Sequence, residues 1–243
     1  GMAAAYAARD RGGDHRPVIA ATMFGVTTKG VMTAKAWLEE QGYEVLVFHA
    51  VGTGGRAMEA LAADGFIDGI LDLTTTELAD ELVGGIFPAS PDRLQVAGRC
   101  GIPCVISVGA LDMVNFGPRA SVPEKFAGRH FYEHNAGITL MRTTPSECAE
   151  LARIICERLR AGRGPVKLML PLRGISAMAV PGGAFHDPEA DRALFDGLRA
   201  CIDPSIELIE MDEDINSPAF ALAAAQALDR MIGQRARSRS YFP

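Results

Sequence analysis

Short, continuous apolar runs recur along the 243-residue chain and are separated by longer segments with helical periodicity. Runs such as Val18–Ala21 and Val45–Phe48 lack the polar alternation of a strand with one wet face. Continuous apolar character is typical of strands that helices cover on both faces. The expected strands are Val18–Met23, Glu44–Phe48, Gly69–Leu73, Cys104–Val108, Gly137–Met141, Val166–Leu170 and Ile206–Ile209.

Helix-start signals lie between these runs. Thr74–Glu77 and Thr144–Glu147 both fit the capping box, in which a threonine and a later glutamate satisfy N–H groups at a helix start. The alternation predicts an α/β fold: a doubly wound, mostly parallel sheet with helices on both faces, hence a Rossmann-like three-layer domain. We expect one ligand-binding domain over residues 18–233, a linker or expression remnant at 1–17 and a basic tail at 234–243.

Composition narrows the class of protein. A formal net charge of −6 argues against nucleic acid, because phosphate-backbone binding needs a concentrated positive surface. The basic run Arg235, Arg237, Arg239 is interpreted as a solvated end. No segment reaches the roughly 18 apolar residues that a bilayer-spanning helix needs, so no membrane partner is expected. The five cysteines lack Cys-x-x-Cys spacing, which predicts buried reduced thiols and a cytoplasmic location.

The connections that leave strands differ from those that enter them. The entering connections are short turns, whereas the leaving ones hold most of the glycine, threonine and asparagine. In open α/β sheets ligands bind outside the carboxyl ends of the strands. We therefore expect one ligand site at that edge, built from Phe24–Gly30, His49–Gly55, Thr74–Glu77, Gly109–Gly117, Arg173–Ser176 and Asp212–Asn216.

Glycines and hydroxyls in the first three of these loops suit an anion. Backbone N–H groups of a glycine-rich loop at a helix start attract phosphate or carboxylate, although the spacing here is neither a Walker loop nor a dinucleotide fingerprint. Plain tight turns and helix caps are the alternatives. The candidate ligand-binding residues are Gly25, Thr27, Thr28, Gly52, Thr53, Gly54, Gly55, Thr74, Thr75 and Thr76.

Four further polar side chains are candidates at the same edge. Arg142 and Arg173 follow strands and could clamp a phosphate or carboxylate through paired N–H groups, or form salt bridges between loops. Asn115 and Asn135 could bind ligand hydroxyls, and Asn115 could instead bond within its own turn.

Proton transfer would fall to His49, Asp112 or His134, although no nucleophile–base pair is recognisable. The string His130–His134 has the spacing of an inverted zinc-protease motif, which works only on a helix. The short segment here favours polar site-edge residues, and we expect no metal site of that kind. Carboxylates in Asp212–Asp214 could hold ribose hydroxyls or Mg²⁺, or form a solvated loop.

Seven strings in one order resemble the Tm-one-like family, which has a plant member that confers tomato mosaic virus resistance and mostly uncharacterised bacterial members. They are Met23–Thr28, Gly52–Gly55, Asp72–Glu77, His134–Asn135, Thr139–Thr144, Pro171–Gly174 and Asn216–Phe220. The similarity runs from Pro17 to Met231. It implies a two-domain parent protein of which this chain is similar to the C-terminal domain alone, with ATP binding assigned chiefly to the first domain.

Three hypotheses follow. The first is a domain that binds a nucleotide or another phosphate- or carboxylate-bearing molecule, with ATP and Mg²⁺ as candidate ligands. The second is an enzyme of unknown class acting on such a molecule. The third is an assembly module that completes a site with a companion N-terminal family domain, or forms a homo-oligomer such as a dimer.

Overall fold

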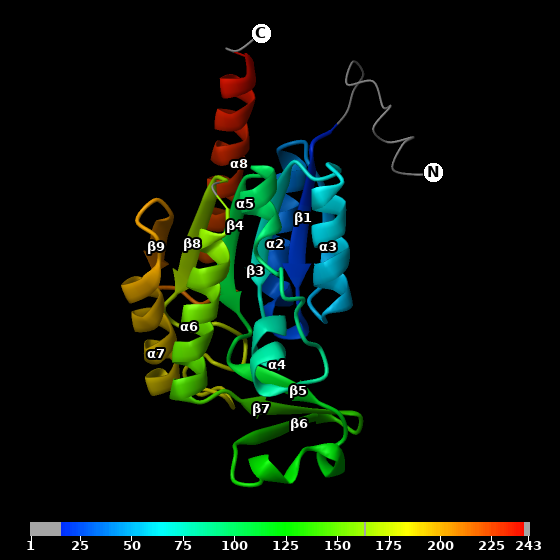
Figure 1. The fold of residues 1–243 in the computed structure, drawn as a ribbon, viewed down its shortest axis with the longest axis vertical. Coiled ribbons are helices and arrows are strands. Elements are labelled where there is room, and N and C mark those ends of the chain that lie inside the picture. The colour runs from blue at the N-terminus through cyan, green and yellow to red at the C-terminus, as the bar shows by residue number, and fades with distance from the viewer. Residues whose placement is uncertain (1–15, 163, 241–243) are drawn as a thin grey trace.

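The computed structural model describes residues 16–162 and 164–240, and its centre is a six-stranded parallel sheet (Figure 1). The strand order is β2-β1-β3-β4-β8-β9. The strands are β1 (Val18–Met23), β2 (Glu44–His49), β3 (Gly69–Thr74), β4 (Cys104–Gly109), β8 (Val166–Pro171) and β9 (Glu207–Met211). Six of the seven expected strands take part, and the predicted three-layer α/β fold is confirmed.

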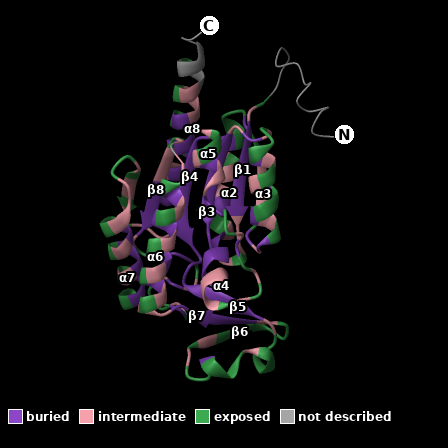
Figure 2. Ribbon diagram, in the orientation of Figure 1, coloured by how far each residue is buried: buried purple, intermediate pink, exposed green. Residues whose placement is uncertain are grey.

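Helices cover both faces of this sheet. Ile19 and Ala21 point into the layer formed by α2 (Thr28–Glu40) and α8 (Pro218–Ser240). Val18 and Ala20 point into the opposite layer. That layer contains α3 (Thr53–Ala63), α4 (Glu77–Val83), α5 (Val96–Cys100), α6 (Pro145–Arg160) and α7 (Pro188–Cys201). The inner strands β1, β3 and β4 are therefore the most buried part of the molecule, as Figure 2 shows, which explains their continuous apolar character. The edge strands β2 and β9 are only partly covered.

The seventh expected strand belongs to a second sheet. The segment predicted as Gly137–Met141 is β7 (Ile138–Arg142), the centre of an antiparallel sheet of order β5-β7-β6. Its neighbours β5 (Met113–Phe116) and β6 (Phe131–Asn135) were not predicted. The short 3₁₀ turns η2 (Arg119–Ser121) and η3 (Glu124–Phe126) join them, while η1 (Gly25–Thr27) follows β1. This small sheet lies beyond the carboxyl ends of the parallel strands, beside α4 (Figure 1).

The two expected capping boxes have different outcomes. Thr144 caps α6 as predicted, because its hydroxyl accepts the Glu147 N–H and the Glu147 side chain accepts the Thr144 N–H. The box at Thr74–Glu77 is wrong. Thr74 ends β3, and α4 begins at Glu77 without a side-chain cap. The carboxylate of Glu77 is engaged elsewhere, as described below.

The cysteine prediction needs correction. Cys156 on α6 and Cys201 on α7 form a disulfide, so the argument from reduced thiols to a cytoplasmic compartment fails for this pair. Cys104 and Cys148 are buried free thiols as expected, and Cys100 is an exposed one.

Among the helices of the described residues, not one combines the length and apolar character that crossing a bilayer requires.

Two of the predictions concern the ends of the chain. The predicted basic tail begins within α8, whose backbone continues to Ser240. The expected linker lies almost wholly outside the described residues.

Candidate functional site

Three loops meet pairwise at the carboxyl edge of the parallel sheet. The loops after β1 and β3 touch through the hydroxyls of Thr27 and Thr74, 2.8 Å apart. The loops after β1 and β2 touch through the stacked rings of Phe24 and His49, with centroids 5.3 Å apart. The loops after β2 and β3 touch through Glu77, described next. With strand order β2-β1-β3, this junction includes the β1/β3 switch point where flavodoxin-like sheets bind their ligands.

The glycine-rich loop after β2 binds an anion supplied by the protein itself. The N–H groups of Gly52 and Gly55 donate to Glu77 Oε1 over 2.5 and 3.3 Å. Gly52 has a φ of +76°, which favours glycine, and a Cβ on Gly55 would lie 2.5 Å from Glu77 Oε2. The N–H groups of two candidate ligand-binding residues, Gly52 and Gly55, are therefore bonded to a buried glutamate of the protein itself.

A buried arginine, which sequence reasoning missed, holds Glu77 in place. Arg93 Nε donates to Glu77 Oε2 over 2.8 Å, and Arg93 Nη2 donates to Asp72 Oδ1 over 2.7 Å. Arg93 Nη1 binds the second oxygen of Asp72. We call Arg93, Asp72 and Glu77 the Arg93 cluster. The nearby carboxylates raise the pKa of Arg93 well above its usual value despite burial, so the guanidinium stays charged.

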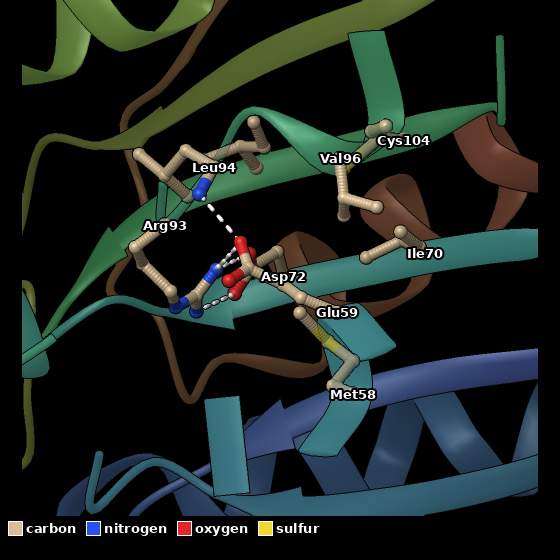
Figure 3. Close-up of a pocket in the computed structure, with 10 residues that line it drawn as sticks. Met58, Glu59, Ile70, Asp72, Arg93, Leu94, Val96 and Cys104 are labelled. Carbon is tan, nitrogen blue, oxygen red and sulfur yellow. Dashed lines mark hydrogen bonds and ion pairs between the residues drawn. The ribbon is translucent and has the colours of Figure 1, made fainter. Parts of the chain in front are cut away.

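Figure 3 shows Arg93 and Asp72 of this cluster together with their neighbours Glu59 and Leu94. Glu59 of α3 accepts the Leu94 N–H over 2.8 Å, and its carboxylate lies 3.8 Å from Arg93 Nη1. Burial raises the pKa of Glu59 to about 7. A cavity of about 10 Å³ lies beside Asp72 and Glu59, enough space for one water molecule at most.

Most of the threonine hydroxyls at the junction form hydrogen bonds within the protein. Thr27 Oγ1 donates to Phe24 O over 3.1 Å, and Thr28 Oγ1 does the same over 3.0 Å. Thr75 Oγ1 donates to Ser107 O over 3.1 Å. Thr76 differs, because its buried Oγ1 has no hydrogen-bond partner within the described residues. Capping and loop bonding thus account for the hydroxyls of Thr27, Thr28 and Thr75, but not for that of Thr76.

The accessible groups at the junction come from the first two loops. Gly25, His49 and Thr53 are exposed, and Thr28 is half-buried. Gly54 is half-buried in the first turn of α3. Lys29, in the first turn of α2, is also exposed, and sequence reasoning overlooked it. The available signal was its place in the glycine-containing segment Phe24–Gly30 that follows the first strand.

The two candidate arginines are both engaged with the protein. Arg142 is the last residue of β7, and its Nη2 donates to Asp191 Oδ1 over 2.6 Å while its Nε donates to Phe185 O over 2.9 Å. Arg173 forms two bonds to the carboxylate of Asp212, of 2.5 and 2.7 Å. Both arginines thus form internal salt bridges, the second of the two alternatives: Arg173 joins two loops, and Arg142 joins the end of β7 to α7.

Asp112 and Asn115 lie at the small sheet rather than in a long loop. Asp112 directly precedes β5, and its Oδ2 accepts the Ser176 hydroxyl over 2.7 Å. Its Oδ1 has no partner among the described residues, and burial raises the pKa of Asp112 to about 6. Asn115 lies within β5, where its side-chain amide donates to the buried Asp80 over 3.2 Å.

His134 and Asn135 are exposed on β6, at the edge of the small sheet. A strand cannot place His130 and His134 on one helix face, so the arrangement of the zinc-protease motif is not formed. The Asn135 side chain accepts the Gly137 N–H over 2.8 Å and so shapes the turn between β6 and β7.

Fold and site together define a parallel α/β domain whose carboxyl edge carries three interlocked loops and an added antiparallel sheet. Residues 16–232 match the C-terminal domain of the uncharacterised protein family UPF0261, and the chain belongs to this family. A UPF0261 protein from Clostridium tetani is 51% identical over 89% of this chain and 54% of its own length. A UPF0261 protein from Mesorhizobium japonicum is 47% identical over 89% of this chain and 55% of its own.

A plant protein is similar at the same level. The ToMV resistance protein Tm-1(GCR237) of Solanum lycopersicum is 48% identical over 84% of this chain and 28% of its own length. The expected resemblance to one domain of a longer protein is confirmed. The chain spans about half the length of the bacterial relatives that it matches.

Proposed function

We propose that this domain binds a small phosphate- or carboxylate-bearing molecule, a nucleotide among them, at the carboxyl edge of its parallel sheet. The observation that carries the proposal is the pairwise contact of the three loops after β1, β2 and β3. Because Glu77 occupies the N–H groups of Gly52 and Gly55, the ligand would contact the outer groups instead. These are Gly25, Thr28, Lys29, His49 and Thr53.

Electrostatics supports an anionic ligand at these outer groups. The first turns of α2 and α3 both lie at the junction, and helix starts carry partial positive charge. The Lys29 side chain adds a full charge and has no hydrogen bond or ion pair within the described chain. A lysine without an internal carboxylate partner is available to an external one.

Hydrophobic groups beside the junction support a ligand that also has an apolar part. Phe24 and Val26 of the first loop, together with Met178, are only partly buried and pack against Ala110, Met113, Leu140 and Phe185. Small-molecule sites combine such apolar surface with a few polar groups that fix orientation. A nucleotide, with a ring and a phosphate, satisfies both requirements.

Thermal unfolding with ATP, ADP and sugar phosphates tests the proposal. A ligand at a hundred times its Kd adds about 2.7 kcal/mol to the free energy of unfolding, which raises Tm by several degrees. Lys29→Ala should weaken binding about tenfold through loss of one charge-assisted contact. Lys35→Ala is the matched control, because Lys35 lies on the same helix and pairs with Glu39. Unchanged Tm with every phosphorylated compound at millimolar concentration contradicts the proposal.

A second candidate function is catalysis, and Asp112 is the observation that favours it. A buried carboxyl with one unpartnered oxygen and a pKa of about 6 suits general acid–base chemistry. The neighbouring Ala110 has a φ of +59°, a strained conformation that clusters at functional sites. Turnover that survives both Asp112→Asn and His49→Ala would exclude these two residues as the base.

A further inference from the structure

A groove separates α3 from α5 on the side of the sheet opposite α2 and α8. Its volume is about 300 Å³, at the lower end of the range of small-molecule sites. The walls come from α3, α5 and the segment that precedes α5. The polar lining residues are Arg56, Glu59, Ser90, Asp92, Arg99 and Cys100. None of these residues belongs to the three-loop junction where the proposed function lies.

Two guanidinium groups, of Arg56 and Arg99, and two carboxylates, of Glu59 and Asp92, line this groove. Arg56 is exposed, and its side chain has no hydrogen bond or ion pair within the described residues. Arg99 donates to Asp92 Oδ1 over 3.3 Å, and both side chains are exposed. Arg99 also donates to the side chain of Gln95, and the second carboxylate of the lining, Glu59, accepts bonds from Leu94 and Ser90. Within the described residues Arg56 is therefore the cation of this groove without an internal partner.

The back wall adds hydroxyl and carboxyl groups. Ser90 Oγ donates to Glu59 Oε2 over 3.3 Å, a long bond that an external acceptor can replace. Glu59 faces Arg93 and Asp72 on its inner side and the groove on its outer side. With a pKa of about 7, Glu59 is partly protonated at neutral pH and repels an anion less than an ordinary glutamate would.

We propose that the groove between α3 and α5 is a second ligand site, for a compact anion with carboxylate or phosphate groups. Arg56 and Arg99 would each donate paired N–H groups to the anion, and Ser90 would donate its hydroxyl. Arginine suits this task because its planar fork matches both groups. The volume excludes a large ligand and accommodates a molecule of the size of citrate.

Cys100 makes the proposal testable in the intact chain, because it is the exposed free thiol in the groove lining. The other four cysteines are either buried thiols or joined in the disulfide. Iodoacetamide is uncharged, so its rate of reaction with Cys100 reports access to the groove rather than attraction to the arginines. Mass spectrometry would measure that rate with inorganic phosphate or citrate added, against chloride at matched ionic strength.

Citrate or phosphate at ten times its Kd should slow the reaction about tenfold by mass action. Arg56→Gln and Arg99→Gln should each shift the required concentration upward about tenfold, while Arg153→Gln on the exposed face of α6 should leave it unchanged. Slowing no greater than that by chloride, or equal protection in Arg56→Gln, overturns the proposal. Neither result depends on the junction after β1, β2 and β3.

Discussion

Two buried arginines organise the carboxyl edge in different ways. Arg93 binds two carboxylates, and all four oxygens of Asp72 and Glu77 accept hydrogen bonds. Arg142 binds one carboxylate, that of Asp191, and otherwise donates to carbonyl and hydroxyl oxygens. Around Arg93 every carboxylate oxygen therefore accepts a hydrogen bond. Near Arg142, in contrast, Asp112 retains one oxygen without a hydrogen-bond partner among the described residues.

The comparison distinguishes a region whose carboxylate oxygens are all bonded within the protein from a region that keeps an unpartnered carboxyl oxygen. The Arg93 cluster joins β3, α4 and the loop after β2, so its charged groups hold these three segments together. The Arg142 region joins the small sheet to α7 and leaves a carboxyl that titrates near neutral pH. Removal of charges should therefore affect stability in the first region and pH dependence in the second.

The largest effect is expected from Arg93→Met. This change leaves Asp72 and Glu77 buried without a counter-charge, which costs roughly 3–5 kcal/mol of unfolding free energy. Arg142→Met should cost less, about 2–3 kcal/mol, because most of its partners are uncharged. Denaturant titration measures both values, with the exposed Arg153→Met as control. Equal costs for the two buried arginines would break the comparison.

Asp112→Asn tests the second region through pH. The folded pKa of about 6 lies above the ordinary value, so the folded state binds the extra proton and wild-type stability falls as pH rises from 4 to 6. Relative to wild type, the variant should therefore gain about 2–3 kcal/mol between pH 4 and pH 8.

Asp203→Asn is the control for this measurement. The Ser205 hydroxyl lowers the pKa of Asp203, so its pH dependence has the opposite sign. A stability difference between Asp112→Asn and wild type that stays constant from pH 4 to pH 8 would show that Asp112 has an ordinary pKa.

The smallest effect is expected within the loop after β3, where a bonded and an unbonded threonine hydroxyl can be compared. Thr75→Val removes a bond to Ser107 O and should cost about 1 kcal/mol. Thr76→Val removes a hydroxyl that has no partner in the described structure and should change stability by less than about 0.5 kcal/mol. Chemical denaturation of the two variants gives the contrast. Equal losses would reveal a partner for Thr76.

Much of the fold could be predicted, because buried parallel strands impose a continuous apolar pattern. The small sheet could not, since β6 is mostly exposed and its sequence Phe131–Asn135 has no strand-like alternation. β5 lies within a stretch whose Asp112 and Asn115 suggested a polar loop. Both residues are buried against Ser176 and Asp80, partners that are distant in the chain.

The meeting of the loops at one edge was predictable, but the bonds between them were not. The loops rich in glycine and threonine do meet at one edge, because parallel strands end there together. Arg93 escaped notice because its two partners lie 16 and 21 residues away. The available signal was Asp72, a lone carboxylate inside the buried strand Gly69–Thr74, which requires a counter-charge.

The hold of Glu77 on the glycine loop has a thermodynamic consequence. A loop whose N–H groups are already bonded to Glu77 is ordered before any ligand binds. Binding of a ligand at the proposed site beside this loop would therefore not include the entropy loss of ordering a disordered segment. Calorimetry should then find a small heat-capacity change, in proportion to the surface that is covered and without a contribution from folding.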